Sequence, residues 1–334
     1  MILCIVLVAL FSGKTSLATD AWEAWQQKAG PISVVDQNPV QLLFLQPMPD
    51  RATPLPEGHS MIRINTTLTN TLVSKASDHY EATLDMEAVR IRLEASYGLL
   101  PGLELACSVP VSHYYSGLLD KAVYDVEDFF GNIRGIRESE TRNRFTYAVK
   151  KDGTTFISGS ENTVGLGDVV MRVKAAVLKG RDGGPALSAR ACLKLPTGRA
   201  SKAFGSGKTD WGVGLLLEQD IQKATVYVNG DVTFPGEAFE DEGVFLQEFF
   251  TILFGAEYRF TPRFSVIAQL YHTGRPFQDT GVEVLDRRIY ELVLGASYRI
   301  QQSLVIQGGL VEDIIDSADA TADVTFFLDL GILF

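Results

Sequence analysis

The chain has 334 residues, 46% of them hydrophobic, and a formal net charge of −11. The length allows one large domain or two ordinary ones, and the acidic balance argues against a nucleic-acid partner, because phosphate binding needs a basic surface. Glycine is abundant at 30 residues, together with 19 Phe and 11 Tyr. This composition favours a β-rich protein over a helical one.

The first 18 residues have the features of a secretory signal peptide. An apolar run from Ile2 to Phe11 is too short to cross a bilayer as a helix. The small residues Ser16 and Ala18 follow it with the spacing of a cleavage site. We therefore predict a signal peptide at 1–18, with a buried strand or a membrane anchor as the alternative.

A Pro-rich segment follows the signal peptide. Residues 19–59 contain six prolines, whose spacing interrupts both helices and sheets. This pattern predicts an extended arm, which either lies in the periplasm or plugs the domain that follows. Residues 60–334 are predicted to form that single domain.

The segments of this domain alternate between apolar and polar residues. In YELVLGASYRI at 290–300, for example, apolar side chains occupy the even positions and face one side. A period of two is typical of a β-strand whose two faces meet different surroundings. About twelve such strands follow one another, near 60–74, 79–98, 103–115, 164–179, 185–199, 209–221, 224–236, 243–261, 263–277, 285–300, 303–313 and 321–334.

The connections between the predicted strands alternate in length. Every second one is a tight turn, such as Gln222-Lys223, whereas the others are longer and polar, the longest at 116–163. Short turns on one rim and long loops on the other are typical of an outer-membrane barrel, in which closure leaves no unpaired sheet edge in lipid. We therefore predict an all-β fold: an antiparallel transmembrane β-barrel of about 12 strands with an N-terminal Pro-rich arm. A soluble β-sandwich is the alternative, but it would not sort turn lengths by rim.

One predicted strand departs from the pattern. Within 79–98, the apolar residues shift from the face of Leu84 and Met86 to that of Val89 and Ile91. Either a β-bulge or the point where the strand leaves the membrane explains such a shift. Both interpretations stay open at this stage.

Three segments carry a resemblance to known proteins. The C-terminal ADVTFFLDLGILF resembles the last strand of bacterial outer-membrane proteins, which ends in Phe after alternating apolar residues. VGLGDVVMRVKAAV at 164–177 and ACLKLPTGRASKAFGSGKTDWGVGL at 191–215 resemble proteobacterial outer-membrane barrels of a domain-of-unknown-function family, similar to outer-membrane transporters of the phenol-degradation type. The resemblance covers most of the chain after about residue 30. It implies a barrel, names no ligand, and implies an assembly signature read by the barrel-assembly machinery at Phe326, Leu328, Leu330, Ile332 and Phe334.

The motifs that suggest other chemistry are incomplete. Gly207-Lys208-Thr209 ends like a nucleotide-binding P-loop, but Lys202 occupies the position of the first glycine and a strand pattern follows. The four histidines lack metal-ligand spacing, so we expect neither a metal nor a cofactor. Ser112-His113 has no matching acid for nucleophilic hydrolysis. We therefore expect no enzymatic activity.

The inward faces of the predicted strands carry charges of both signs. Strand parity assigns a basic wall and an acidic wall to the lumen. A lattice of salt bridges between them would prop a closed barrel, whereas a field across a water-filled pore would orient dipolar solutes. The Pro-rich arm and the 116–163 loop, with a short helix near 120–133, are the candidates for a constriction. The basic wall comprises Arg90, Arg92, Arg172, Lys174, Arg190 and Lys194, and the acidic wall comprises Glu218, Asp220, Asp231, Glu257, Glu291 and Asp329.

These features favour a pore or facilitator for a small solute in the bacterial outer membrane. Its expected partners are membrane lipid, the barrel-assembly machinery and the solute, without nucleic acid. Two other functions are compatible with the same barrel. One is an outer-membrane lipid-modifying enzyme, and the other is a non-conducting structural or adhesive barrel.

Overall fold

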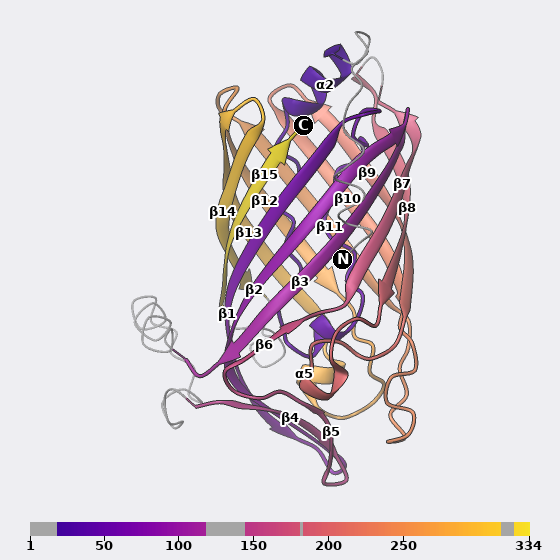
Figure 1. Ribbon diagram of the computed structural model, residues 1–334, viewed down its shortest axis with the longest axis vertical. Helices are drawn as coiled ribbons and strands as arrows, with labels where there is room; N and C mark the ends of the chain where they lie inside the picture. The colour runs from indigo at the N-terminus through magenta and orange to yellow at the C-terminus, as the bar shows by residue number, and fades with distance from the viewer. Residues whose placement is uncertain (1–18, 118–143, 181–182, 315–323) are drawn as a thin grey trace.

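Twelve antiparallel strands form a closed barrel in the computed structural model, which describes residues 19–117, 144–180, 183–314 and 324–334 (Figure 1). The predicted all-β barrel is therefore confirmed. No helix in these ranges is long and apolar enough to cross a membrane. The predicted signal peptide and the short helix near 120–133 lie outside the described residues. The wall strands are β1 (Ser60–Ala76), β2 (Tyr80–Leu100), β3 (Leu103–Tyr115), β7 (Val169–Lys179), β8 (Ala186–Leu195), β9 (Asp210–Ile221), β10 (Ala224–Phe234), β11 (Phe249–Arg259), β12 (Phe264–Thr273), β13 (Ile289–Gln301), β14 (Leu304–Asp313) and β15 (Val324–Leu333).

The barrel closes where the first wall strand meets the last. β1 pairs with β15 from Met61↔Leu333 to Asn70↔Val324 and with β2 on its other side. The backbone N–H of Ser60 donates to the Phe334 carbonyl at 3.1 Å, and the reverse bond measures 2.9 Å. Closure satisfies the backbone groups of both strands, which is what a sheet in lipid requires.

Short and long connections lie on opposite rims, as the sequence predicted. The tight turns share one rim with the C-terminus, and the long loops share the other with α5 (Glu283–Asp286) (Figure 1). The 116–163 region also contains a hairpin, β4 (Thr146–Lys151) and β5 (Thr154–Ser158), which the sequence did not reveal. β4 pairs with the first residues of β2, Tyr80–Asp85, and β6 (Thr163–Leu166) pairs with β3. These short strands form because the overhanging wall strands offer free backbone partners.

β2 resolves the irregularity seen in its sequence. Its register with β1 is unbroken from Ser60↔Tyr97 to Ala76↔Glu81, so these two strands form no bulge. The even-numbered residues face inward throughout, first as buried Leu84 and Met86 and then as Arg90 and Arg92. The strand therefore extends past the membrane, where its inner face packs in an apolar cluster.

The outer face of the barrel is an exposed apolar band. Near mid-strand, Leu215, Phe254 and Leu294 are 56%, 56% and 42% exposed. Such a continuous apolar surface needs lipid around it, and together with the closed sheet it places the chain in an outer membrane. Exposed aromatic rings flank the band at the tight-turn rim (Tyr258, Phe260, Tyr298 and Phe334) and toward the other rim (Trp211, Phe250 and Tyr290).

The Pro-rich segment runs inside the barrel. After α2 (Thr19–Gln26) at the tight-turn rim, the chain descends through the lumen to η2 (Gln41–Leu43) and then returns to β1 (Figure 1). Most of its residues from Gly30 to Leu55 are buried. We refer to residues 27–59 as the lumen arm.

An apolar cluster covers the loop end of the lumen. Its members come from the arm turn, the overhanging β2, the β4–β5 hairpin and the long loops. Phe44 of the lumen arm packs edge-on against Phe277 and Phe239, with ring centroids 5.6 and 6.4 Å apart. Hydrophobic burial therefore fixes the tip of the lumen arm beneath the loops.

A substitution series on β13 tests the lipid contact. Leu294→Arg should lower the free energy of unfolding by about 2–4 kcal/mol, because it puts a cation near the bilayer midplane. Ile300→Arg, on the same face at the rim, should cost only about 0–1 kcal/mol. Denaturant unfolding in lipid vesicles measures both values, and equal costs would contradict the membrane depth assigned to this strand.

Candidate functional site

The strands turn all twelve predicted wall residues toward the lumen. Five of the basic side chains are buried, and Arg90 is partly exposed to an internal cavity. On the acidic side, Asp220 is exposed at the tight-turn rim, whereas the other five carboxylates are buried. Buried charges at this density need partners, since an isolated ion costs several kcal/mol to remove from water.

The two walls meet directly at one point. Arg190 on β8, Gly214 on β9 and Asp231 on β10 are register neighbours across three strands. The Arg190 guanidinium donates from Nε to Asp231 Oδ1 at 2.7 Å and makes a second bond from Nη2 to Oδ2. A Cβ at Gly214 would collide with this carboxylate. The glycine thus lets a two-bond ion pair form over the intervening strand.

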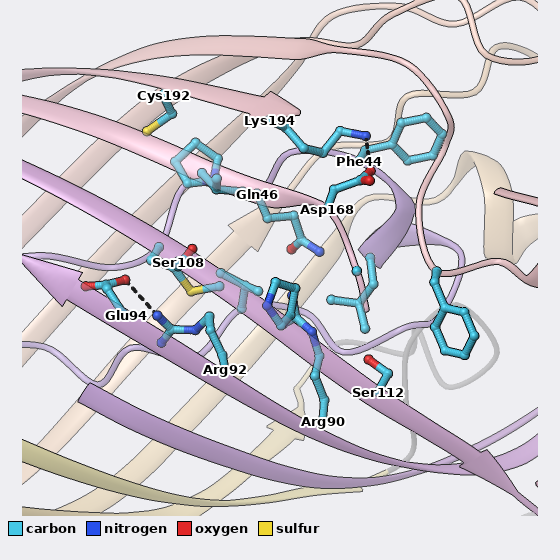
Figure 2. Close-up of a pocket in the computed structure, with 18 of the residues that line it drawn as sticks. Phe44, Gln46, Arg90, Arg92, Glu94, Ser108, Ser112, Asp168, Cys192 and Lys194 are labelled. Atoms are coloured by element: carbon cyan, nitrogen blue, oxygen red, sulfur yellow. Dashed lines mark hydrogen bonds and ion pairs between the residues drawn. The ribbon is translucent and has the colours of Figure 1, made fainter. Parts of the chain in front are cut away.

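Lys194 connects the wall to both a loop and the lumen arm. Its Nζ lies 2.8 Å from Asp168 Oδ2, a pair visible in Figure 2, and 3.2 Å from Asp210 Oδ2. It also donates to the Leu43 carbonyl of the lumen arm at 2.8 Å and to Ser206 Oγ at 2.7 Å. Ser206 belongs to the glycine-rich loop that resembles a P-loop, and β9 follows that loop in place of a helix. This excludes the P-loop geometry.

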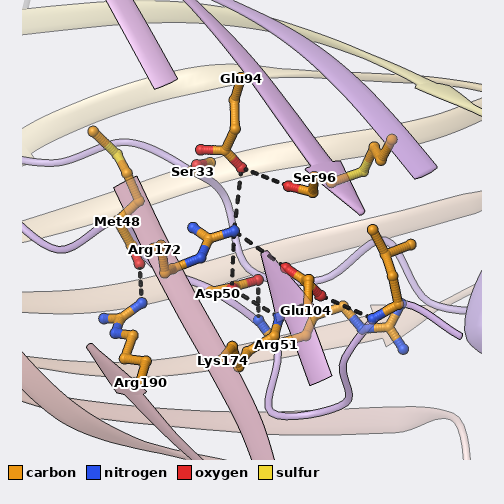
Figure 3. A network of polar contacts seen from close by, with 12 residues as sticks. Ser33, Met48, Asp50, Arg51, Glu94, Ser96, Glu104, Arg172, Lys174 and Arg190 are labelled. Atoms are coloured by element: carbon orange, nitrogen blue, oxygen red, sulfur yellow. Dashed lines mark hydrogen bonds and ion pairs between the residues drawn. The ribbon is translucent and has the colours of Figure 1, made fainter. Parts of the chain in front are cut away.

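A network of ion pairs occupies the middle of the lumen. Arg172 lies at its centre, with Nη2 3.3–3.4 Å from oxygens of Glu94, Glu104 and Asp50 (Figure 3). Lys174 Nζ reaches Asp50 at 2.8 Å and Glu104 at 3.0 Å. Asp50 belongs to the lumen arm, so these contacts tie the arm to β2, β3 and β7.

Acidic wall residues bind the backbone of the lumen arm. Glu257 accepts hydrogen bonds from the N–H groups of Ala29 and Gly30 at 3.1 and 3.2 Å. Glu218 accepts from the Thr53 N–H at 3.2 Å and from Lys28 Nζ at 2.6 Å. The carboxylates therefore satisfy donors that the irregular arm cannot pair within a sheet.

Basic wall residues bind the carbonyls of the same arm. Arg92 Nη2 donates to the Ser33 carbonyl at 2.9 Å, and its Nη1 pairs with Glu94 at 2.7 Å. Arg190 Nη1 donates to the Met48 carbonyl at 2.5 Å. The lumen arm thus lies between the two walls and contacts both.

Two acidic wall residues have other surroundings. Asp329 lies 3.3 Å from Arg63 Nε on β1. Glu291 is buried on β13, and its Oε2 has no hydrogen-bond partner within the described part of the chain. Within the described part of the chain, neither side chain forms a hydrogen bond with the lumen arm.

Sequence reasoning missed several charged residues of this site. Glu94 and Glu104 lie on the inward faces of their strands, and Glu94 follows Arg92 on the same face, so parity could have identified both. The arm residues Lys28, Asp50 and Arg51 had no such signal, because the arm has no repeating period. Their contacts depend on where the arm folds.

Among the described residues, cavities lie on two sides of the lumen arm. The larger, of about 50 Å³, lies between arm residues 35–48 and the inner faces of β2, β3, β7 and β8 (Figure 2). The smaller, of about 30 Å³, lies toward the tight-turn rim, between the start of the arm and β1, β14 and β15. The ion network of Arg172 separates them along the lumen.

The structure gives no support to the hydrolytic motif. Ser112 lines the larger cavity, whereas neighbouring His113 stacks on Tyr115 with ring centroids 5.1 Å apart. Adjacent strand residues point to opposite faces, so the two side chains do not converge. In the described ranges, no three His, Cys, Asp or Glu side chains cluster as metal ligands would.

The residues of the predicted assembly signature lie on the outer face of β15. Phe326 and Leu328 are 45% and 54% exposed, and Phe334 is 57% exposed at the rim. Leu330 and Ile332 lie between them on the same face and are partly exposed.

The chain belongs to the family described as "Protein of unknown function (DUF3187)", which it matches over residues 7–334. A search of curated proteins finds no match. The fold is similar to the COG4313 outer membrane channel from Pseudomonas putida F1, at 14% identity and a TM-score of 0.57, over 87% of this chain and 100% of that one. Lower similarities are a NanC porin (8%, TM-score 0.47, 81% and 98%) and a Pseudomonas aeruginosa FadL homologue (9%, 0.41, 91% and 99%). At these identities the likeness shows the fold alone.

The absence of a side chain at Gly214, beneath the Arg190–Asp231 pair, can be tested by substitution. Gly214→Ala should displace the Asp231 carboxylate and lower the free energy of unfolding by about 1–3 kcal/mol, the usual range for overpacking. Gly230→Ala on the adjacent strand is the matched control, because its added methyl meets nothing within 4 Å. Denaturant unfolding of both variants provides the comparison. If both variants lose the same amount of stability, the ion pair does not depend on a glycine at position 214.

Proposed function

We propose that this DUF3187 protein is an outer-membrane pore or facilitator for small solutes, with the lumen arm as its constriction. The observation that carries the proposal is a closed membrane barrel whose polar lumen is filled by one segment outside the sheet. That segment joins the barrel covalently only at β1, and its hydrogen bonds to the walls are mostly made by side chains. Water or a polar solute can replace such bonds without unravelling a strand.

The charged walls have two roles in this proposal. With the arm in place, they form the ion-pair lattice that holds it between them. Displacement of the arm would free the groups that bind its backbone, among them Glu257, Glu218 and Lys194, and a field across the lumen would then act on a solute. The two sequence-based interpretations of the walls thus correspond to two positions of the arm.

The two cavities support a passage along one side of the arm. Both contain charged groups and water-sized space, and the ion network of Arg172, Glu94 and Asp50 lies between them. Widening that network would join the cavities. A non-conducting structural barrel is the second candidate, because the lumen is densely filled in the conformation described.

Deletion of the arm tests the constriction. A variant that lacks residues 20–57 should conduct several times more current per channel in planar bilayers, because the segment that fills the lumen is gone. Heat-modifiable mobility on gels verifies that the variant still forms a barrel. A folded variant with unchanged current would contradict the constriction, and a folded variant without current would favour the structural barrel.

We further propose that the barrel-assembly machinery reads the last strand. Deletion of Phe334 should slow assembly into the membrane while export to the periplasm continues, because only the end of the terminal strand is damaged. Tyr298→Ala, which removes another exposed aromatic ring at the same rim, should assemble at the normal rate. Pulse-chase measurement of heat-modifiable barrel tests this. Normal assembly of the truncated chain would argue against the signature.

A further inference from the structure

One cation of the basic wall differs from the other five in having no counterion. Arg92, Arg172, Lys174, Arg190 and Lys194 each lie within 3.4 Å of a carboxylate oxygen. Arg90 makes no ion pair and no side-chain hydrogen bond with any residue that the structure describes.

The position of Arg90 in the sheet explains why no carboxylate on a neighbouring strand pairs with it. Its register neighbours are Thr67 on β1 and Ser112 on β3, neither of which carries a charge. Its nearest charged neighbour on the inward face is Arg92, which is itself paired with Glu94. Repulsion from Arg92 adds to the cost of a buried guanidinium, so the site gains stability when an anion enters.

The side chain of Arg90 lines the larger cavity. Figure 2 shows it extending from β2 toward Gln46 of the lumen arm, with Arg92 and Ser112 on either side. The hydroxyl groups of Ser108 and Ser112 also line the cavity and make no hydrogen bond to another described residue. Ser112 is the register neighbour of Arg90, so its hydroxyl and the guanidinium are two unused donors beside each other, whereas Ser108 lies four residues away along β3, at about 13 Å.

The charge of the cavity favours an anion. Its lining includes four basic side chains but only two acidic ones, Glu94 and Asp168. Both carboxylates are already bonded to neighbouring cations. Arg92, Arg172 and Lys194 are likewise bonded to carboxylates, some of them just outside the lining, so Arg90 alone offers a solute an unpaired positive charge.

The other lining residues define the class of anion. Phe44, Tyr114 and Phe204 form an apolar wall, and the last two rings stack with centroids 4.9 Å apart. A guanidinium matches the two oxygens of a planar carboxylate, and an apolar wall suits a short hydrocarbon body. The volume of about 50 Å³ admits only a few non-hydrogen atoms while the arm is in place.

We propose that this cavity is a binding site for small monocarboxylate anions, with Arg90 as the primary ligand and Ser112 as a further donor. The inference deepens the proposed pore function, because it names the class of solute that the lumen would take. The arm supplies one side of the site, so a larger carboxylate would need the arm to move.

Binding of propionate to the full-length protein in detergent tests the proposal. In a ligand-observed NMR titration, propionate should bind wild type, and neutral propionamide, which has the same shape, should bind at least about tenfold more weakly. Arg90→Gln should weaken propionate binding by about tenfold or more, and Arg90→Lys should retain part of it. Lys223→Gln, which removes an exposed cation in a tight turn, should bind as wild type does.

Thermal unfolding provides a second measurement. Without added anion, Arg90→Gln should unfold at or above the wild-type temperature, because it removes an unpaired buried charge. Propionate should then raise the unfolding temperature of wild type but not of the variant, since a ligand stabilises only a fold that binds it. Equal binding of propionate and propionamide, or unchanged binding in Arg90→Gln, would overturn the proposal.

Conductance separates this inference from the proposed function. Propionate binding that depends on Arg90 in a barrel without measurable current would support the carboxylate site and reject the pore. A conducting barrel in which Arg90→Gln leaves propionate binding unchanged would support the pore and reject the site.

Discussion

The structure depends on one constraint: a segment without sheet partners must find hydrogen-bond partners for its backbone N–H and C=O groups inside a closed barrel. Buried N–H and C=O groups are costly when unpaired, and the prolines of the lumen arm prevent it from adding a strand. The walls supply the missing partners with charged side chains. Carboxylates such as Glu257 accept from arm N–H groups, and cations such as Arg92 and Lys194 donate to arm carbonyls. The charge density of the lumen and the course of the arm therefore explain each other.

The same constraint determines how the charges are paired. A buried ion pair is weak evidence for stability, because desolvation offsets most of its attraction. In this lumen many of the ions also hydrogen-bond a backbone group of the arm, so their removal would leave both an unpaired charge and an unpaired peptide group. Arg190, for example, binds the Asp231 carboxylate and the Met48 carbonyl together. The arm and the ion lattice should consequently loosen as one unit.

The sequence predicted the strands of the barrel wall far better than the contacts inside the lumen. A period of two identifies strands and inward faces, because each wall residue alternates between lipid and lumen; this applies to Arg172 and Lys174 as much as to Leu294. The pairing of Arg190 with Asp231 needs the strand order and the glycine between them, and neither follows from periodicity. The β4–β5 hairpin depends on the overhang of β2, a tertiary feature. Asp50 and Arg51 lie in a segment without a period, so only the folded arm brings them to their partners.

Different forces close the two parts of the lumen. Apolar packing around Phe44 seals the loop end, whereas ion pairs around Arg172 fill the middle. A solute that passes from the loop side must open the apolar cluster first and exchange polar contacts second. An amphipathic molecule can contribute to both steps, because its apolar body replaces ring contacts and its charged group replaces an ion of the lattice. Neither a purely apolar nor a purely ionic solute can do both.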